Sequence, residues 1–161
     1  MAKIYLASPL FSESELTYNQ YVKHTILDAL PSVDMHLPQE VESINDKEAF
    51  ADSIMIAKAD TQAVLESDLI VAVLDGLVID PGVASEIGIA FQAGIPIVGI
   101  YSDSRQQGGS HPQKLKALQT IAESQFSYIN LYTVGLIKQR GEIVTSAKDA
   151  VAAIQKYISL T

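Results

Sequence analysis

Two short, predominantly apolar runs restrict the folds open to this chain more than any other feature. They are residues 69–74 and 95–101, and each follows a stretch with the residue spacing of a helix. Strands covered by helices on both faces have this composition, whereas strands of a half-exposed sheet alternate apolar and polar residues. The two runs therefore predict a parallel sheet enclosed between layers of helices.

The rest of the chain continues the alternation of strand and helix. Further strands are expected at 3–7 and 33–37, with a strand or turn at 128–131, and helices are expected at 14–30, 46–67, 83–93, 114–123 and 146–158. The apolar stripe of the helix at 46–67 would contain Phe50, Ile54, Ala57 and Val64. The aperiodic stretch 102–112 predicts a mobile loop. With no repeat and no linker, the pattern predicts one domain over 1–161, a flavodoxin-like, doubly wound α/β fold.

Composition excludes several classes of function. The net charge is -8 and the eleven basic residues are scattered, which argues against nucleic-acid binding. No apolar run is long enough to span a membrane, and the first residues have no signal-peptide pattern, so a cytoplasmic protein is expected. The chain has no cysteine and its three histidines are far apart, which argues against a structural metal site.

Three carboxylates cluster where the run 69–74 gives way to the next helix. Asp75 ends the strand, Asp80 lies in the turn and Glu86 is expected in the first helical turn, near the small residue Gly82. In open α/β sheets, ligands bind beyond the carboxyl ends of the strands, so residues 7–11, 75–86 and 101–103 should converge on one crevice. An acid near a helix N-terminus also has a structural role with the helix dipole. However, this helix looks buried nearly all round, and an acid in apolar surroundings favours a functional role.

The pattern around these acids resembles the nucleoside 2-deoxyribosyltransferase family. The resemblance rests on the motif Asp80-Pro81-Gly82 followed by Ser85-Glu86-Ile87-Gly88, and on residues 5–11 at the start of the chain. It implies that Glu86 is the nucleophile that holds 2-deoxyribose covalently while one base replaces another. It also implies that Asp60, which Asp68 follows eight residues later, faces the base, that Tyr5 bonds the nucleophile and that Asp80 lies near the sugar 5′-hydroxyl.

These roles agree with the chemistry of the N-glycosidic bond. Its cleavage passes through an oxocarbenium-like state, which a carboxylate below the sugar can stabilise and trap while a second group protonates the leaving base. We expect Glu86 to stay ionised because of its helix N-terminus and Tyr5, and Asp60 to keep a proton because of burial and a neighbouring carboxylate.

Further residues are assigned to substrate binding. Gln39 could bond a base edge through its amide, although an exposed loop residue would fit the same position. Asn130 resembles a residue that relatives lend to a neighbouring subunit's site, but it would also serve as a cap. The predicted substrate-binding set is Asp80, Gly82, Asn130, Gln39, Ser8 and Asp75.

Two alternative functions remain open at this point. The first is a hydrolase acting on 2′-deoxynucleoside 5′-monophosphates, against which Asp80 argues because a carboxylate near the 5′ position repels a phosphate. The loop 8–12 also lacks the features of a phosphate cradle, although Arg105 and Lys58 provide positive charge. The second is a sensing domain that has lost catalysis. No organic cofactor is implied. The expected partners are deoxyribonucleosides, free nucleobases and further copies of the chain, as a dimer or a hexamer.

Overall fold

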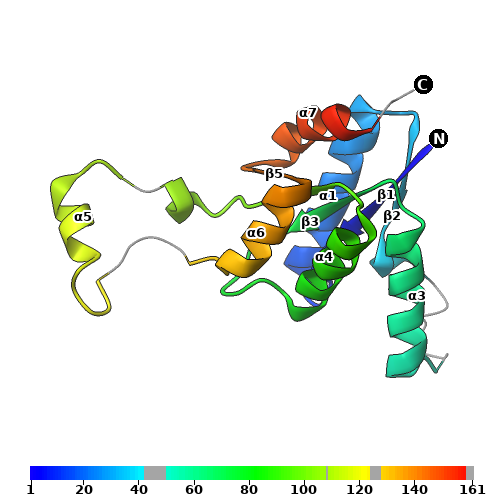
Figure 1. Cartoon of the computed structure of the whole chain (residues 1–161), viewed down its shortest axis with the longest axis horizontal. Coiled ribbons are helices and arrows are strands. Elements are labelled where there is room, and N and C mark those ends of the chain that lie inside the picture. The colour runs from blue at the N-terminus through cyan, green and yellow to red at the C-terminus, as the bar shows by residue number, and fades with distance from the viewer. Residues whose placement is uncertain (42–49, 108, 124–127, 159–161) are drawn as a thin grey trace.

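One parallel sheet forms the centre of the molecule (Figure 1). The computed structural model describes residues 1–41, 50–107, 109–123 and 128–158. Within these residues the strand order is β2-β1-β3-β4-β5. The strands are β1 (Ala2–Ala7), β2 (Val33–His36), β3 (Leu69–Val73), β4 (Ile97–Ile100) and β5 (Gly141–Val144). This is the flavodoxin-like order, so the predicted doubly wound fold is confirmed.

Helices pack on both faces of the sheet, as Figure 1 shows. One face is covered by α1 (Glu13–Ala29) and α7 (Ala147–Tyr157), and the other by α4 (Pro81–Ala93) and α6 (Leu131–Arg140), with α3 (Ser53–Leu65) beside α4. Successive residues of β1 point to opposite faces, so Ile4 and Leu6 join one apolar core while Tyr5 and Ala7 join the other. No helix in the described ranges combines the length and hydropathy that crossing a bilayer requires.

The topological switch point, where the connections after neighbouring parallel strands pass to opposite faces, falls between β1 and β3. β1 leads into α1 on one face, whereas β3 leads into α4 on the other. The two connections therefore diverge and leave a crevice at the carboxyl ends of these strands, where α/β proteins bind their ligands. Tyr5 and the 75–86 segment both lie at this edge.

The helix expected at 46–67 is shorter than predicted. Residues 46–49 lie outside the described part, Phe50 precedes the helix, and α3 begins at Ser53 because the Asp52 side chain accepts a bond from Met55 N at 2.8 Å and caps it. The prediction that this apolar stripe forms a buried face was wrong, since Phe50 is 83% exposed and Ile54 is 62% exposed. Only Val64 of α3 is buried.

The carboxyl-terminal third differs most from the sequence prediction. The expected helix at 114–123 is the short α5 (Pro112–Ala117), and two short 3-10 turns occupy Pro38–Glu40 and Ser104–Gln107. Asn130 caps α6, which the sequence analysis missed, together with β5. At Gly141 a Cβ atom would lie 1.9 Å from Ile97 O, so a glycine is required for β5 to approach β4.

Candidate active site

A hydrogen bond joins strand β1 to helix α4 at the candidate site. Tyr5 projects from β1 into the core beneath α4, and its hydroxyl donates to Glu86 Oε1 at 2.6 Å. Because α4 begins at Pro81, Glu86 lies in the second helical turn and not in the first, as the sequence analysis expected. The position still directs its side chain across the end of β1. The expected contact between Tyr5 and the candidate nucleophile is thus present in the structure.

The helix that carries Glu86 is half-buried and not enclosed all round, which corrects the sequence interpretation. Val83, Ile87 and Ala90 are buried against the sheet, whereas Ser85 and Gln92 face outward. Glu86 itself is partly exposed, and none of the ion pairs among the described residues includes it. Its carboxylate is therefore neither sealed in the core nor neutralised by a basic side chain.

The pKa of Glu86 is raised to about 7, chiefly because burial disfavours the charged form. The hydrogen bond from Tyr5 lowers the pKa, while the carboxylates of Asp60 and Asp80 raise it. The expectation that its surroundings would favour ionisation was therefore only partly right, because desolvation outweighs the phenol. Burial also raises the pKa of Tyr5, as does the adjacent Glu86, so the phenol remains a proton donor.

Asp60 lies on α3 and completes the pair of carboxyl groups. Burial raises the pKa of Asp60, and positive charge on His36 opposes that rise. The direction agrees with the expected proton donor, although Asp60 and Glu86 are both shifted upward and not in opposite directions. The following acid, Asp68, instead accepts a bond from Lys3 N at 2.8 Å and ties β1 to the start of β3.

Asp80 has a clear structural role at the start of α4. Its Oδ1 accepts bonds from Gly82 N at 2.8 Å and Val83 N at 3.1 Å, which satisfies two free donors of the helix N-terminus. A Cβ atom on Gly82 would lie 2.9 Å from the same oxygen, so this glycine makes room for the cap. The cap places the Asp80 carboxylate near enough to Glu86 to act on its pKa.

Asp75 belongs to a second group of polar residues at the same sheet edge. Its carboxylate accepts bonds from Ser102 N at 2.7 Å, Ser102 Oγ at 2.6 Å and Asp103 N at 3.1 Å. Pro9, Asp75 and Ser102 line a hollow of about 240 Å³ beside Tyr18. The three segments expected to converge at this edge therefore do so, but Asp75 lies on the α1 side, away from the pair formed by Tyr5 and Glu86 on the α4 side.

The remaining predicted residues are more dispersed. Both ends of the Gln39 amide are engaged with α1, since Oε1 accepts from Asn19 at 2.9 Å and Nε2 donates to Leu16 O at 3.3 Å. Ser8 is buried directly after β1. Asn130 is exposed and its Oδ1 accepts from Tyr132 N and Thr133 N, so its visible role is that of a helix cap.

The sequence analysis missed His36, because its neighbours depend on how β2 is aligned with β1. Strand β2 alternates buried and exposed positions, and its register places His36 directly beside Tyr5. The candidate site is acidic and contains Tyr5, His36, Asp60, Asp80 and Glu86. The carboxylate of Glu86 is held by Tyr5, and the carboxyl group of Asp60 lies close enough to act on it. Such a pair can trap a developing cation and protonate a leaving group. Among the described residues, no three or more His, Asp or Glu side chains are arranged so that they could hold a metal ion.

Comparison with known proteins identifies the family of the chain. The sequence profile of the nucleoside 2-deoxyribosyltransferases matches residues 4–135. The chain belongs to this family. The match includes β1 with Tyr5, α3 with Asp60 and α4 with Glu86, so the family assignment made from the motifs is confirmed. No protein of curated function matches the chain.

Solved structures support the same fold. A conserved protein from Enterococcus faecalis V583 is 56% identical, with a TM-score of 0.92 over 98% of this chain and 99% of its own. The 2-deoxyribosyltransferase from Bacillus psychrosaccharolyticus is 21% identical, with a TM-score of 0.64 over 93% and 90%. That from Leishmania mexicana is 18% identical, with a TM-score of 0.63 over 96% and 97%. The family and its fold are thus established for this chain.

Proposed function

We propose that this protein transfers the 2-deoxyribosyl group between nucleobases, with Glu86 as the covalent nucleophile. The observation that carries the proposal is the 2.6 Å hydrogen bond from Tyr5 to Glu86 Oε1. It fixes one oxygen of the carboxylate, so the other oxygen, Oε2, is the atom that attacks the anomeric carbon. Family membership and the fold of the solved transferases support this assignment.

The proposed reaction has two balanced steps. In the first, Glu86 Oε2 forms a bond to C1′ as the C1′–N bond breaks, and Asp60 gives its proton to the departing base. In the second, the incoming base forms a new N-glycosidic bond, Glu86 leaves C1′, and the base returns a proton to Asp60. The raised pKa of Asp60 supports its role as the proton donor. With a pKa of about 7, roughly half of Glu86 is ionised at neutral pH.

Substrate selection is assigned to the start of α4. The Asp80 carboxylate acts on Glu86 electrostatically and would lie at the 5′ end of a sugar bound above it. A carboxylate accepts a hydrogen bond from a 5′-hydroxyl but repels a 5′-phosphate. We therefore favour nucleosides over 5′-monophosphates, with no organic cofactor. Ser8 and Gly82 stay in the proposed substrate-binding set, whereas Gln39, whose amide bonds α1, and Asp75, which lies on the α1 side, do not.

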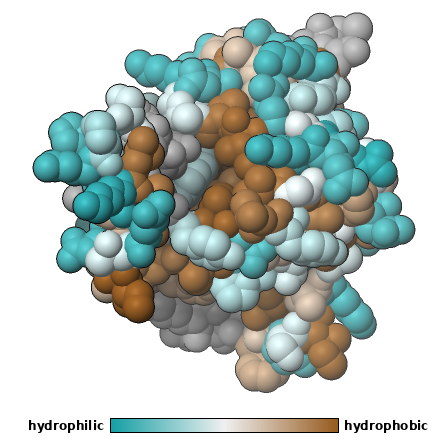
Figure 2. All heavy atoms as spheres, turned by 60° about the vertical axis from the view of Figure 1, so that its left-hand side comes forward, coloured by the Kyte–Doolittle hydropathy of each residue, from teal (hydrophilic) through white to brown (hydrophobic). Residues whose placement is uncertain are grey.

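A second copy of the chain is proposed to complete each site through Asn130. Figure 1 shows α5 far from the sheet. Apolar side chains between α5 and α6 are exposed: Ile121 is 97% exposed, and Leu131 and Tyr132 are also largely exposed. Figure 2, in which the left-hand side of Figure 1 comes forward, shows apolar surface on the visible face. Burial of such surface against another copy would carry Asn130 into a neighbouring site.

Base exchange tests the proposed function directly. The protein is incubated with deoxyinosine and free adenine or cytosine, and chromatography follows the new nucleoside against free hypoxanthine. We expect exchange with little net hydrolysis in the wild type and none in Glu86→Ala. Glu142→Gln, a glutamate paired with Lys156 on the far side of the sheet, is the control and should be fully active.

The same assay separates the other functions. Activity restricted to 2′-deoxynucleoside 5′-monophosphates, with base release to water, would replace the transferase by a hydrolase. Binding of nucleosides without turnover would indicate a sensing domain. For the shared site, a mixture of inactive Glu86→Gln and Asn130→Ala chains should regain activity after subunit exchange, because some sites then contain both native residues.

A further inference from the structure

His36 occupies a position that no step of the proposed reaction yet uses. The register of the parallel strands pairs it with Tyr5, and the two side chains lie on the same face of the sheet. Their rings stack with centroids 5.3 Å apart and planes inclined by 12°. Adjacent strands lie about 4.8 Å apart, so this stack follows from the register itself. His36 thus rests against the ring whose hydroxyl holds Glu86.

The second contact of His36 is electrostatic and reaches the other carboxyl group. Its positive charge lowers the pKa of Asp60, against the effect of burial. His36 therefore contacts the tyrosine that holds Glu86 and is close enough to Asp60 to act on its pKa. It acts on Glu86 through Tyr5 by ring packing, and on Asp60 through space by charge.

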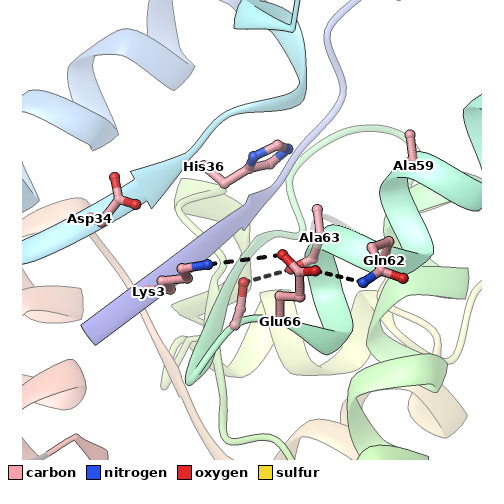
Figure 3. Close-up of a pocket in the computed structure, with 8 residues that line it drawn as sticks. Lys3, Asp34, His36, Ala59, Gln62, Ala63 and Glu66 are labelled. Carbon is pink, nitrogen blue, oxygen red and sulfur yellow. Dashed lines mark hydrogen bonds and ion pairs between the residues drawn. The ribbon is translucent and has the colours of Figure 1, made fainter. Parts of the chain in front are cut away.

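A hollow of about 290 Å³ separates this side of the sheet from α3 (Figure 3). His36 lines this hollow. Lys3 and Glu66, whose charged groups lie 3.9 Å apart, line it as well. The hollow lies between the imidazole and α3, and the ring of Tyr5 stacks on the imidazole. The titratable and charged groups around the ring are Lys3 and Tyr5 on β1, Asp34 on β2, Asp60 and Glu66 on α3, and Glu86 beyond Tyr5 on α4.

We propose that His36 is a positioning residue, which keeps the Tyr5 hydroxyl directed at Glu86 through the ring stack and sets its own charge against Asp60. The proposal rests on the proposed glycosyl transfer, because Glu86 and Asp60 take their roles from it. The two effects are separable. An aromatic replacement keeps the stack and removes the charge, whereas a small replacement removes both.

The test compares His36→Phe with His36→Ala by kinetics. His36→Ala should lower kcat for base exchange about tenfold, the scale of a lost aromatic contact, with little change in KM. His36→Phe should keep kcat within about threefold. It should also move the limb of the pH profile that reports Asp60 to higher pH, because the positive charge that lowers its pKa is gone. His24→Phe and His24→Ala are the matched controls and should change neither quantity, because His24 is exposed on α1, where its Nδ1 bonds Gln20 O.

A readout without turnover distinguishes failure of this proposal from failure of the proposed function. Tyrosine labelled with ¹³C at Cζ, with the Tyr5 signal assigned by Tyr5→Phe, should show the titration of Glu86 near pH 7 in the wild type and in His36→Phe. In His36→Ala that titration should weaken and the signal should move toward that of free tyrosine. If His36→Ala does not fold, His36→Gln, which also lacks a ring, takes its place.

Unchanged Tyr5 signals and kcat in His36→Ala would overturn the proposal, as would equal losses in His36→Phe and His36→Ala. By contrast, full base exchange in Glu86→Gln would overturn the proposed function. The Tyr5 signal would still decide in that case whether His36 orients the phenol.

Discussion

The helices that carry the two carboxyl groups are held in different ways. α4 begins at the Asp80 cap, ends at Gly94 in the left-handed region with φ 78, and packs against β1, β3 and β4. α3 also has an aspartate cap, but its main helical neighbour is α4, and it buries only Val64. Ile54, Met55 and Leu65 of α3 are exposed. One acid therefore stands on a fixed element and the other on an element at the margin of the core.

This difference matches what the two roles require. A nucleophile must approach a carbon atom at about 3 to 3.5 Å in one direction, which favours a rigid support. A proton donor that serves several bases meets nitrogen atoms at different places, and a less confined helix is compatible with that task. The contrast between α4 and α3 fits the roles that we propose, covalent attack by Glu86 and proton transfer by Asp60.

The largest expected effect separates the two acids. Glu86→Gln should reduce base exchange by at least about 10⁴-fold, since it removes the nucleophile. Asp60→Asn should reduce it by about 10² to 10³-fold, the scale of a lost general acid. Initial rates with natural bases measure both. With a nucleoside whose base leaves without protonation, the Asp60→Asn defect should shrink and the Glu86→Gln defect should not. Equal defects with both kinds of substrate would remove the distinction between the helices.

Matched isoleucines test how firmly each helix is packed. Ile87→Ala on α4 should lower the free energy of unfolding by about 2 to 5 kcal/mol, because Ile87 is fully buried. Ile54→Ala on α3 should cost about 0.5 kcal/mol or less, since that side chain is largely exposed. Urea denaturation of the two variants measures the difference. Similar losses in both would show that α3 is packed as firmly as α4.

The raised pKa of Glu86 makes a prediction about stability and pH. Its pKa is 4.5 as a free group and about 7 in the fold, so the native state holds a proton that the unfolded chain has lost between these values. Stability from this group is present below pH 4.5 and is lost as pH rises to about 7, by on the order of 3 kcal/mol. The free energy of unfolding of Glu86→Gln should therefore rise relative to that of the wild type between pH 4.5 and 7. Above pH 7 the difference between the two should stay constant. A constant difference from pH 4.5 to 8 would contradict the shift.

The smallest expected effect concerns Tyr5. Tyr5→Phe keeps the ring and removes the bond that lowers the pKa of Glu86, so the pKa should rise further. The acidic limb of the pH profile of kcat/KM should then move to higher pH, with a loss of about tenfold at pH 7. Rates measured from pH 5 to 9 follow the shift. An acidic limb at the wild-type pH would show that the phenol does not control the nucleophile.

Much of the fold could be predicted because its central strands are buried on both faces. The sequence around β3 and β4 is therefore almost continuously apolar, which makes both strands easy to recognise. The last part of the sheet gave a weaker signal. β5 has only four residues, all half-buried, and α6 carries exposed Leu131 and Tyr132 at its start, so neither has the pattern of an ordinary core element.

The sequence indicated the residues of the candidate site more fully than it indicated their pKa shifts. Tyr5 and Glu86 are 81 positions apart, and the motifs that they share with the family linked them. The upward shift of Glu86 depends on how deeply α4 packs against the sheet, which spacing along the chain does not contain. The neighbour relation of His36 and Tyr5 likewise depends on the register between β1 and β2.

The most direct measurement for the central claim is the mass of the protein quenched in acid during turnover of a deoxyribonucleoside. Peptide mapping should find one 2-deoxyribosyl group on Glu86 in the wild type and none in Glu86→Gln. Base exchange without any adduct on Glu86, or with the sugar attached to another residue, would contradict the account.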